Sequence, residues 1–185
     1  MSDPSGAVGG ASSLATAEIH SPLGPLRIAA TAAGLARIAF ASGARSDFQG
    51  WLERHVPSAD VVTNLPALDT ACKELRAYFD GGLTKFTVPL DLRGTSFQLA
   101  VWQKLREIPF GETWTYGQMA ERLGKPGAQR AVGLANGSNP VAIVVPCHRV
   151  TAARGRLGGF GGGLQAKRWL LAFEGRGLPL LRRSR

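Results

Sequence analysis

The sequence predicts an α/β protein in which a part built from strands and one helix is followed by a mostly helical part. Short apolar runs separated by Pro and Gly occupy much of the first 90 residues, which is typical of strands joined by turns. In later segments apolar residues recur at intervals of three and four, which favours helices. The charge changes between the halves: residues 1–90 hold 7 Lys/Arg and 8 Asp/Glu, a net of −1, whereas residues 91–185 hold 15 and 5, a net of +10.

Composition and charge divide the chain into four expected segments. Residues 1–15, rich in Gly, Ala and Ser, are expected to form a disordered leader, and residues 179–185 a basic tail. Between them we expect an N-terminal α/β domain at 16–92 and a helical domain at 93–178. No apolar run approaches the roughly 20 residues of a membrane helix, and the leader lacks the basic start of a signal peptide. Two cysteines cannot make a disulfide framework, so we expect a cytoplasmic protein without membrane association.

The first part is expected to hold three strands, one helix and a further short strand. The strands are predicted at 17–20, 26–30 and 35–41, the helix at 68–79, and the further strand at 85–90. A turn at Gly34 suggests a hairpin between two of the strands. Cys72 lies on the apolar stripe of the helix, where a small buried hydrophobe is its expected role.

The second part is expected to hold four helices. They are predicted at 95–108, 115–123, 128–136 and 164–173. The second and third are joined by a short turn at 124–127, so they are interpreted as a helix-turn-helix. The net charge of +10 makes this half a candidate polyanion binder, because Lys and Arg that neutralise phosphates release counterions.

The third helix of this part is unusually rich in small residues, which include Ala128, Ala131, Gly133, Ala135 and Gly137. Gly weakens a helix and small residues leave its surface open, so something is expected to approach this face closely. Close packing against another helix is the alternative. Arg130 is the only charge in the segment, and in a basic half it is a candidate contact to nucleic acid.

Cys147 is the candidate nucleophile. It follows an unbroken apolar run at 141–145, interpreted as a buried strand, and His148 and Arg149 are its next two neighbours. The thiolate is the reactive form, and cationic neighbours lower the pKa of a thiol. Glu174 is the acid available to orient a histidine. On spacing alone, however, it would be an exposed glutamate at a helix end.

No cofactor or metal site is expected. The glycine-rich segment at 155–163 lacks the Gly-Lys-Ser/Thr of a phosphate loop, and it would instead let backbone approach a flat ligand. Cys72, His20 and His55 are widely spaced and make no recognisable zinc set.

Several motifs follow one another in order over residues 95–175: Phe110-Gly111-Glu112, Tyr116, Arg130-Ala131-Val132-Gly133, Asn139-Pro140, Pro146-Cys147-His148-Arg149-Val150, Gly162-Gly163-Leu164 and Leu170-Leu171-Ala172-Phe173-Glu174-Gly175. In these motifs and their spacing the chain resembles the DNA alkyltransferases that repair 6-O-alkylguanine. The resemblance implies a small ribonuclease-H-like α/β domain followed by a winged-helix-like, mostly helical DNA-binding domain. It also implies that the helix-turn-helix enters the minor groove, which is only about 6 Å wide.

The resemblance also implies roles for individual residues. Cys147 takes the alkyl group from O6 of guanine in double-stranded DNA, His148 accepts its proton through a water, and Glu174 orients His148. Tyr116 gives a proton or hydrogen bond to the base, and Asn139 is the hinge between the recognition helix and the active site. The DNA contacts are Arg130, which takes the place of the flipped nucleotide, with Ala128, Ala131, Gly133, Ala135 and Gly137. The base pocket is bordered by Arg149, Val150, Phe160 and Gly161.

The product of this chemistry is a thioether, so each protein molecule reacts once as a suicide enzyme. We expect a monomer that needs no cofactor, no metal and no obligatory protein partner. Phe160 stands where the family often has tyrosine, and Gly161 where serine or alanine is frequent, which leaves substrate breadth open, including O4-alkylthymine. The alternatives are a non-catalytic binder of alkylated DNA, against which Cys147 argues, a Cys-His hydrolase, and a transcription factor that uses the same helices.

Overall fold

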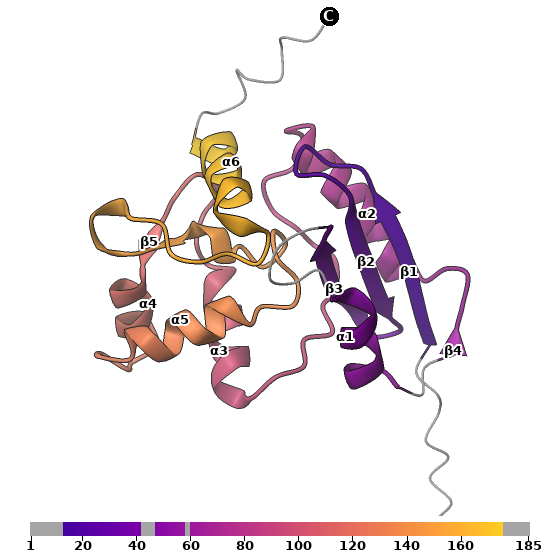
Figure 1. Cartoon of the computed structure of the whole chain (residues 1–185), viewed down its shortest axis with the longest axis horizontal. Helices are drawn as coiled ribbons and strands as arrows, with labels where there is room; N and C mark the ends of the chain where they lie inside the picture. Colours follow the sequence, from indigo (N-terminus) through magenta and orange to yellow (C-terminus); the bar gives the residue numbers. More distant parts are fainter. Residues whose placement is uncertain (1–12, 42–46, 58–59, 176–185) are drawn as a thin grey trace, which may run out of the picture.

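The computed structural model describes residues 13–41, 47–57 and 60–175. Two parts lie side by side, a sheet with a helix on each face and a cluster of helices and loops (Figure 1). Because β1 begins at Ser13, the last three residues of the expected leader belong to the sheet. Residues 1–12 and the expected basic tail lie outside the described residues.

The N-terminal sheet is a meander with one added edge strand. β1 (Ser13–Ile19), β2 (Leu26–Thr31) and β3 (Gly34–Phe40) pair antiparallel in turn, and the two-residue β4 (Asp60–Val61) pairs parallel to β1. The order across the sheet is β3-β2-β1-β4. The expected hairpin at Gly34 is confirmed. Gly34 has a φ of +150°, and a Cβ there would lie 2.6 Å from the Pro89 carbonyl, so only glycine fits this turn.

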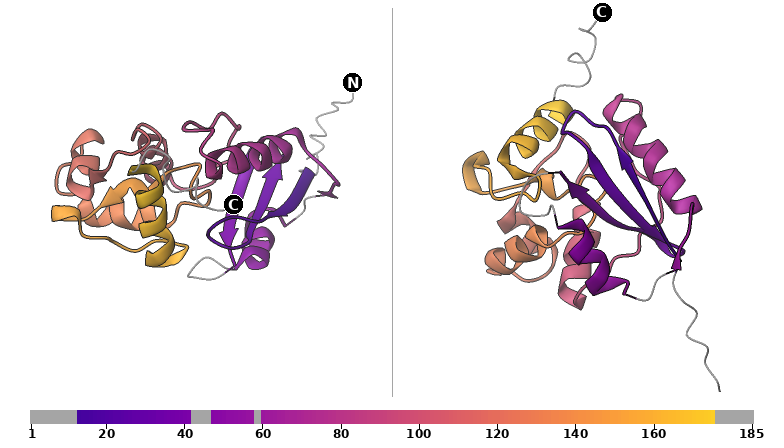
Figure 2. Two further views of the ribbon diagram at one scale, coloured as in Figure 1. Left: turned by 90° about the horizontal axis from the view of Figure 1, so that it is seen from above. Right: turned by 45° about the vertical axis from the view of Figure 1, so that its right-hand side comes forward.

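Helices cover both faces of the sheet (Figure 2). α2 (Pro66–Phe79) confirms the predicted helix, and its buried stripe includes Cys72, whose pKa burial raises. α1 (Phe48–His55) was not predicted from the sequence. Its apolar residues nevertheless stand at helical spacing, and the Asp47 carboxylate caps it by accepting from the Gly50 N–H at 2.9 Å. Phe48, Trp51 and Leu52 of this helix form a second, smaller core against the sheet.

The strand predicted at 85–90 is wrong. Only Leu90 pairs with the sheet, through an isolated bridge to Leu35. The backbone N–H groups of Thr87 and Val88 instead donate to the carboxylate of Glu74 on α2. A side chain therefore satisfies the donors that a neighbouring strand would otherwise satisfy.

The C-terminal part contains the four predicted helices. They are α3 (Ser96–Leu105), α4 (Tyr116–Arg122), α5 (Gln129–Gly137) and α6 (Gly163–Gly175). Thr95 and Thr115 begin α3 and α4 with capping boxes, in which a glutamine three residues later reaches back to the cap. The short strands β5 (Trp114–Thr115) and β6 (Val150–Thr151) pair parallel, and the 3-10 turns η1 (Cys147–Arg149) and η2 (Ala153–Gly155) lie around the second strand.

The run at 141–145 is buried as predicted, but it is not a strand. The Val145 N–H donates to the Val141 carbonyl at 2.9 Å, and Ile143 has a φ of +79°, so the chain makes a tight turn. Asn139 closes this turn, because its amide donates to the Val145 carbonyl at 2.8 Å and accepts from the Val141 N–H at 3.0 Å. The apolar run therefore predicted burial, while a polar side chain decided the conformation.

The two parts share one core. The Ile38 N–H on β3 donates to the Pro140 carbonyl at 3.0 Å, which joins the sheet edge to the turn before the candidate nucleophile. Phe40 on the same strand meets the ring of Phe160 edge-on at 5.5 Å. The sheet therefore directly supports the segments that surround Cys147.

Candidate active site

Cys147 opens the η1 turn and is 4% exposed. The turn closed by Asn139, the expected hinge residue, comes immediately before it. The backbone N–H of Cys147 donates to the Val145 carbonyl at 2.8 Å. The candidate nucleophile is therefore fixed by a turn rather than by the end of a strand.

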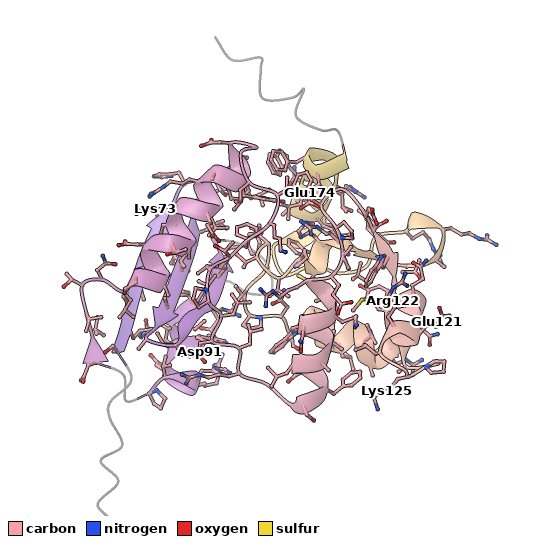
Figure 3. The ribbon with its side chains drawn as sticks, turned by 180° about the vertical axis from the view of Figure 1, so that it is seen from behind. Lys73, Asp91, Glu121, Arg122, Lys125 and Glu174 are labelled. Carbon is pink, nitrogen blue, oxygen red and sulfur yellow. The ribbon has the colours of Figure 1, made fainter. Side chains whose placement is uncertain are left out.

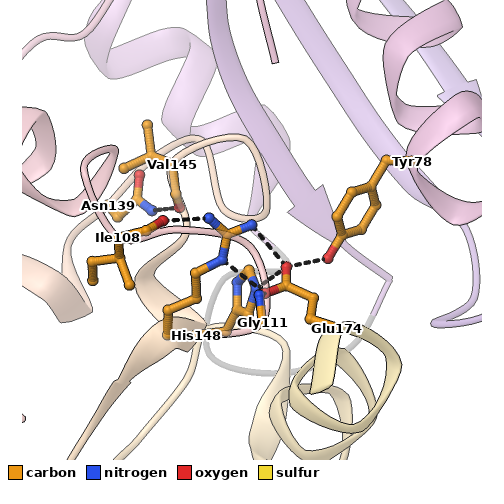
Figure 4. A network of polar contacts seen from close by, with 8 residues as sticks. Tyr78, Ile108, Gly111, Asn139, Val145, His148 and Glu174 are labelled. Atoms are coloured by element: carbon orange, nitrogen blue, oxygen red, sulfur yellow. Dashed lines mark hydrogen bonds and ion pairs between the residues drawn. The ribbon is translucent and has the colours of Figure 1, made fainter. Parts of the chain in front are cut away.

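His148 is fully buried and is held from one side. Its Nε2 lies 2.8 Å from Oε1 of Glu174, and its Nδ1 has no hydrogen-bond partner among the described residues (Figure 4). Burial lowers the pKa of His148 despite the opposing effect of Glu174, so the ring is neutral. With an ionised Glu174 accepting at Nε2, the ring proton sits there and Nδ1 keeps a lone pair that can accept a proton.

Glu174 is the centre of a buried network and not an exposed helix end. The N–H groups of Arg149 donate to both of its carboxylate oxygens at 2.8 and 2.9 Å, and the Tyr78 hydroxyl donates at 2.7 Å. Burial by itself would raise the pKa of Glu174, but the hydrogen bonds from His148 and Arg149 outweigh it and lower the pKa to about 2. Glu174 is therefore ionised throughout the physiological range.

Arg149, expected at the border of the base pocket, is held by the buried network around Glu174. Its guanidinium is paired with Glu174 and donates to the Ile108 carbonyl at 2.7 Å, and the residue is 5% exposed. A buried guanidinium needs a carboxylate partner, and the nearest one belongs to the network behind His148. Figure 3 shows Glu174 where the two parts of the molecule meet, whereas Arg122 and Lys125 lie at the outer side of the C-terminal part.

Lys167 is a buried cation near the nucleophile that the sequence reasoning missed. Its ammonium donates to the Val150 carbonyl at 2.7 Å and to the Gly158 carbonyl at 3.4 Å. Burial lowers its pKa, and the charge of Cys147 acts in the opposite direction. Periodicity could have found it, because Lys167 stands three and seven residues before Leu170 and Glu174, on the buried face of α6.

Tyr116 begins α4 and lies against the glycine-rich loop. A Cβ on Gly158 would lie 2.7 Å from its hydroxyl oxygen, and a Cβ on Gly133 would meet its ring at 3.8 Å. Burial and the charge of Cys147 raise the pKa of Tyr116, and a hydrogen bond with Asn136 opposes them. Gly158 therefore makes room for this tyrosine, whereas a side chain at position 133 would be in ordinary contact with its ring.

The remaining expected pocket residues lie around the same loop. Val150 is buried in the strand after η1, and Gly161 is half-buried. The Phe160 ring stands between Phe40 and His148, at centroid distances of 5.5 and 6.3 Å. Phe160 thus covers His148.

The α5 helix divides into a buried and an exposed face. Arg130, Ala131 and Gly137 are exposed, and Ala128 and Gly133 are half-buried. Ala135 differs from expectation: it is 3% exposed, and its carbonyl accepts from the Trp102 indole N–H at 2.8 Å. Its small size serves packing against α3 and not access to DNA.

Two features are absent from the described residues. No helix there is long and apolar enough to cross a membrane. No group of three or more His, Cys, Asp or Glu side chains is arranged to hold a metal ion in that part of the chain.

Comparison with known proteins assigns both parts of the chain. Residues 15–92 match "6-O-methylguanine DNA methyltransferase, ribonuclease-like domain", and residues 96–176 match "6-O-methylguanine DNA methyltransferase, DNA binding domain". The chain belongs to the 6-O-methylguanine DNA methyltransferase family. The predicted fold class, a ribonuclease-like α/β domain before a helical DNA-binding domain, is thereby confirmed.

Individual members of the family are closely similar to this chain. The methylated-DNA–protein-cysteine methyltransferase of Mycolicibacterium paratuberculosis is 56% identical over 128 residues, which cover 69% of this chain and 78% of that protein. The crystal structure of Mycobacterium tuberculosis O6-methylguanine methyltransferase is 44% identical with a TM-score of 0.77, over 90% of this chain and 96% of that one. The structure of the Mycobacterium tuberculosis OGT in complex with DNA has a TM-score of 0.75 at 44% identity, over 90% and 95%. The match to the DNA-binding domain and the similarity to a structure in complex with DNA therefore support DNA as the partner of this chain.

Proposed function

We propose that Cys147 takes an alkyl group from O6 of guanine in double-stranded DNA, in a single reaction that consumes the protein. The family assignment supports DNA repair by alkyl transfer to a protein cysteine. The observation that supports the residue assignment is the hydrogen bond between Glu174 and His148. The ionised carboxylate holds Nε2, and Nδ1 is left without a partner among the described residues. Such a histidine is a base beside a thiol.

The proposed step is a direct displacement at the alkyl carbon. The Cys147 thiol proton passes through a water molecule to Nδ1 of His148, and the thiolate attacks the carbon attached to O6. The carbon–oxygen bond breaks as the carbon–sulfur bond forms, and the electron pair moves into the guanine ring. Tyr116 gives a proton to the base, so guanine leaves neutral. The thioether on Cys147 has no good leaving group, so the protein does not turn over.

Lys167 supports the charged form of the nucleophile in this proposal. It is the buried ammonium whose charge interacts with Cys147, while Arg149 is paired with Glu174. A cation near a thiol favours the thiolate. The sequence assigned the lowering of the thiol pKa to His148 and Arg149. In this proposal Lys167 on α6 shares that role.

Access to the buried cysteine requires the base to leave the helix. A carbon within the base stack cannot reach a thiol that is 4% exposed, so the nucleotide must flip out. The exposed face of α5 supports entry into the minor groove, because Ala131 and Gly137 leave little bulk beside Arg130. We propose that Arg130 occupies the place of the flipped nucleotide and that the protein acts as a monomer in the cytoplasm.

Intact-mass spectrometry tests the proposal. Incubation with duplex DNA that carries one 6-O-methylguanine should add one methyl group to the protein, at Cys147 and not at Cys72. Cys147→Ser should abolish transfer and keep DNA binding, whereas Cys72→Ser should transfer normally. More than one equivalent of methyl groups, or turnover of excess DNA, would contradict a single-use reaction. Elution as a dimer on a sizing column would contradict the monomer.

A further inference from the structure

Asn136 is a buried polar residue of the recognition helix to which the proposed chemistry gives no role. It belongs to the inner face of α5, opposite to Arg130 and Ala131, and is 3% exposed. Its Nδ2 donates to the backbone carbonyl of Cys147 at 3.3 Å. One amide therefore joins the helix that faces DNA to the turn that carries the nucleophile.

The same side chain also reaches Tyr116. Burial and the charge of Cys147 both raise the pKa of Tyr116, and the hydrogen bond with Asn136 is the influence that lowers it. Because Oδ1 of Asn136 has no hydrogen-bond partner among the described residues, the group that faces the Tyr116 hydroxyl is the amide Nδ2, which also donates to Cys147. The ring of Tyr116 lies against the same helix, since a Cβ on Gly133 would stand 3.8 Å from it. Such a donor makes Tyr116 a stronger acid, which is what proton transfer to a leaving base needs.

The third contact of Asn136 is missing. Its Oδ1 is buried and has no hydrogen-bond partner among the described residues. A buried carbonyl without a partner is destabilising, and a hydrocarbon side chain of similar size would fill the space without that loss. The polar side chain is therefore better explained by its amide N–H groups than by packing.

We propose that Asn136 is a positioning residue for alkyl transfer: its amide holds the Tyr116 hydroxyl and the Cys147 carbonyl in one arrangement, so that proton donor and nucleophile meet the same base. This inference rests on the proposed function, because it assumes that Tyr116 gives a proton to guanine. It also means that the buried face of the recognition helix forms part of the active site, while its exposed face contacts DNA.

The test is a double-mutant cycle between Asn136 and Tyr116. Single-turnover rates are measured with free 6-O-benzylguanine, which needs no DNA binding, in the full-length chain. Asn136→Leu should lower the rate constant by about tenfold to a hundredfold, in the range of a weakened general acid. In the Tyr116→Phe background the same change should lower it several-fold less than in the wild-type background, because only the contact with the Cys147 carbonyl is then left to lose. Asn64→Leu, at an exposed asparagine that donates to Asp69, is the matched control.

The pH profile gives a second readout that a structural role would not move. Tyr116 must be protonated to act, so the rate falls above its pKa. Removing the hydrogen bond from Asn136 raises that pKa, and the alkaline limb should therefore move to higher pH in Asn136→Leu. Asn136→Asp keeps the shape but places a carboxylate beside the phenol, and it should be at least as slow as Asn136→Leu.

Three outcomes would overturn the inference. Equal losses for Asn136→Leu in both backgrounds would mean that Asn136 supports the fold and not Tyr116. An unchanged rate or an unchanged alkaline limb in a folded Asn136→Leu or Asn136→Asp protein would remove its role altogether. If the wild-type protein transfers no alkyl group, the proposed function fails and this inference fails with it. If the wild-type protein transfers normally and the Asn136 variants do so too, only this inference fails.

Discussion

The Tyr78 hydroxyl donates a 2.7 Å hydrogen bond to Oε1 of Glu174, across 96 positions of the sequence. Tyr78 lies on α2 in the N-terminal part, is fully buried, and its ring contacts Phe110 and Phe173 of the C-terminal part. The same oxygen of Glu174 lies 2.8 Å from Nε2 of His148. The N-terminal part therefore supplies one of the donors that hold the carboxylate against His148.

Tyr78→Phe should destabilise the protein and slow transfer. The change removes a hydrogen bond to a buried charge, which is worth about 2 kcal/mol of unfolding free energy. Glu174 keeps Arg149, so the transfer rate should fall only a few-fold. Urea unfolding and single-turnover rates measure the two effects. Thr31→Val removes the hydrogen bond to Asp91 in the same part and should leave the rate unchanged. A normal rate in Tyr78→Phe would show that the tyrosine serves stability alone.

Glu174 should make stability depend on pH in the acid range. Its folded pKa of about 2 lies below the ordinary 4.5, so it contributes stability that is present above about pH 4.5 and is lost as the pH falls toward 2. A shift of this size corresponds to about 3 kcal/mol. Urea unfolding between pH 5 and 2 should show this loss, and Glu174→Gln should flatten it. Glu107→Gln, at an exposed glutamate paired with Lys104, is the control and should keep the wild-type slope.

Lys167→Met should make Cys147 less reactive. Methionine replaces the buried stem of lysine but removes the ammonium that interacts with Cys147. Loss of a nearby cation disfavours the thiolate, so carbamidomethylation of Cys147 by iodoacetamide at pH 7 should slow by about tenfold. Peptide mapping separates this reaction from that of Cys72. Lys125→Met changes an exposed lysine and should react as the wild type does, and equal slowing in both variants would count against the assignment.

Arg130→Ala should slow repair of duplex DNA far more than the reaction with free 6-O-benzylguanine. Flipping a nucleotide costs a few kcal/mol, and a side chain that fills the gap recovers part of it, whereas the free base has no stack to leave. Single-stranded DNA should show an intermediate loss. Arg130→Lys should fall between wild type and Arg130→Ala, because lysine lacks the planar guanidinium. Similar losses on all three substrates would instead place Arg130 in support of the fold.

Local patterns in the sequence determined most of the secondary structure and singled out the candidate reacting pair. Strands β1 to β3 and the helices α2 to α6 follow from apolar periodicity, caps and glycine turns, which act between residues close in sequence. Cys147 and His148 are adjacent in the chain, and the motif around them indicates a thiol with a base beside it. Helix α1 could have been predicted in the same way, because Phe48, Trp51 and Leu52 share one face.

Only the tertiary structure decided which charges meet. Arg149 is adjacent to His148 in sequence but turns to Glu174, while Lys167 comes from α6 to provide the cation near Cys147. Tyr78 joins them from another domain. A buried charge must find a partner, and the partner is set by how distant elements pack, which periodicity and spacing do not record. The apolar run before Cys147 makes the same point, since hydrophobicity determined that it is buried and the Asn139 side chain determined that it turns.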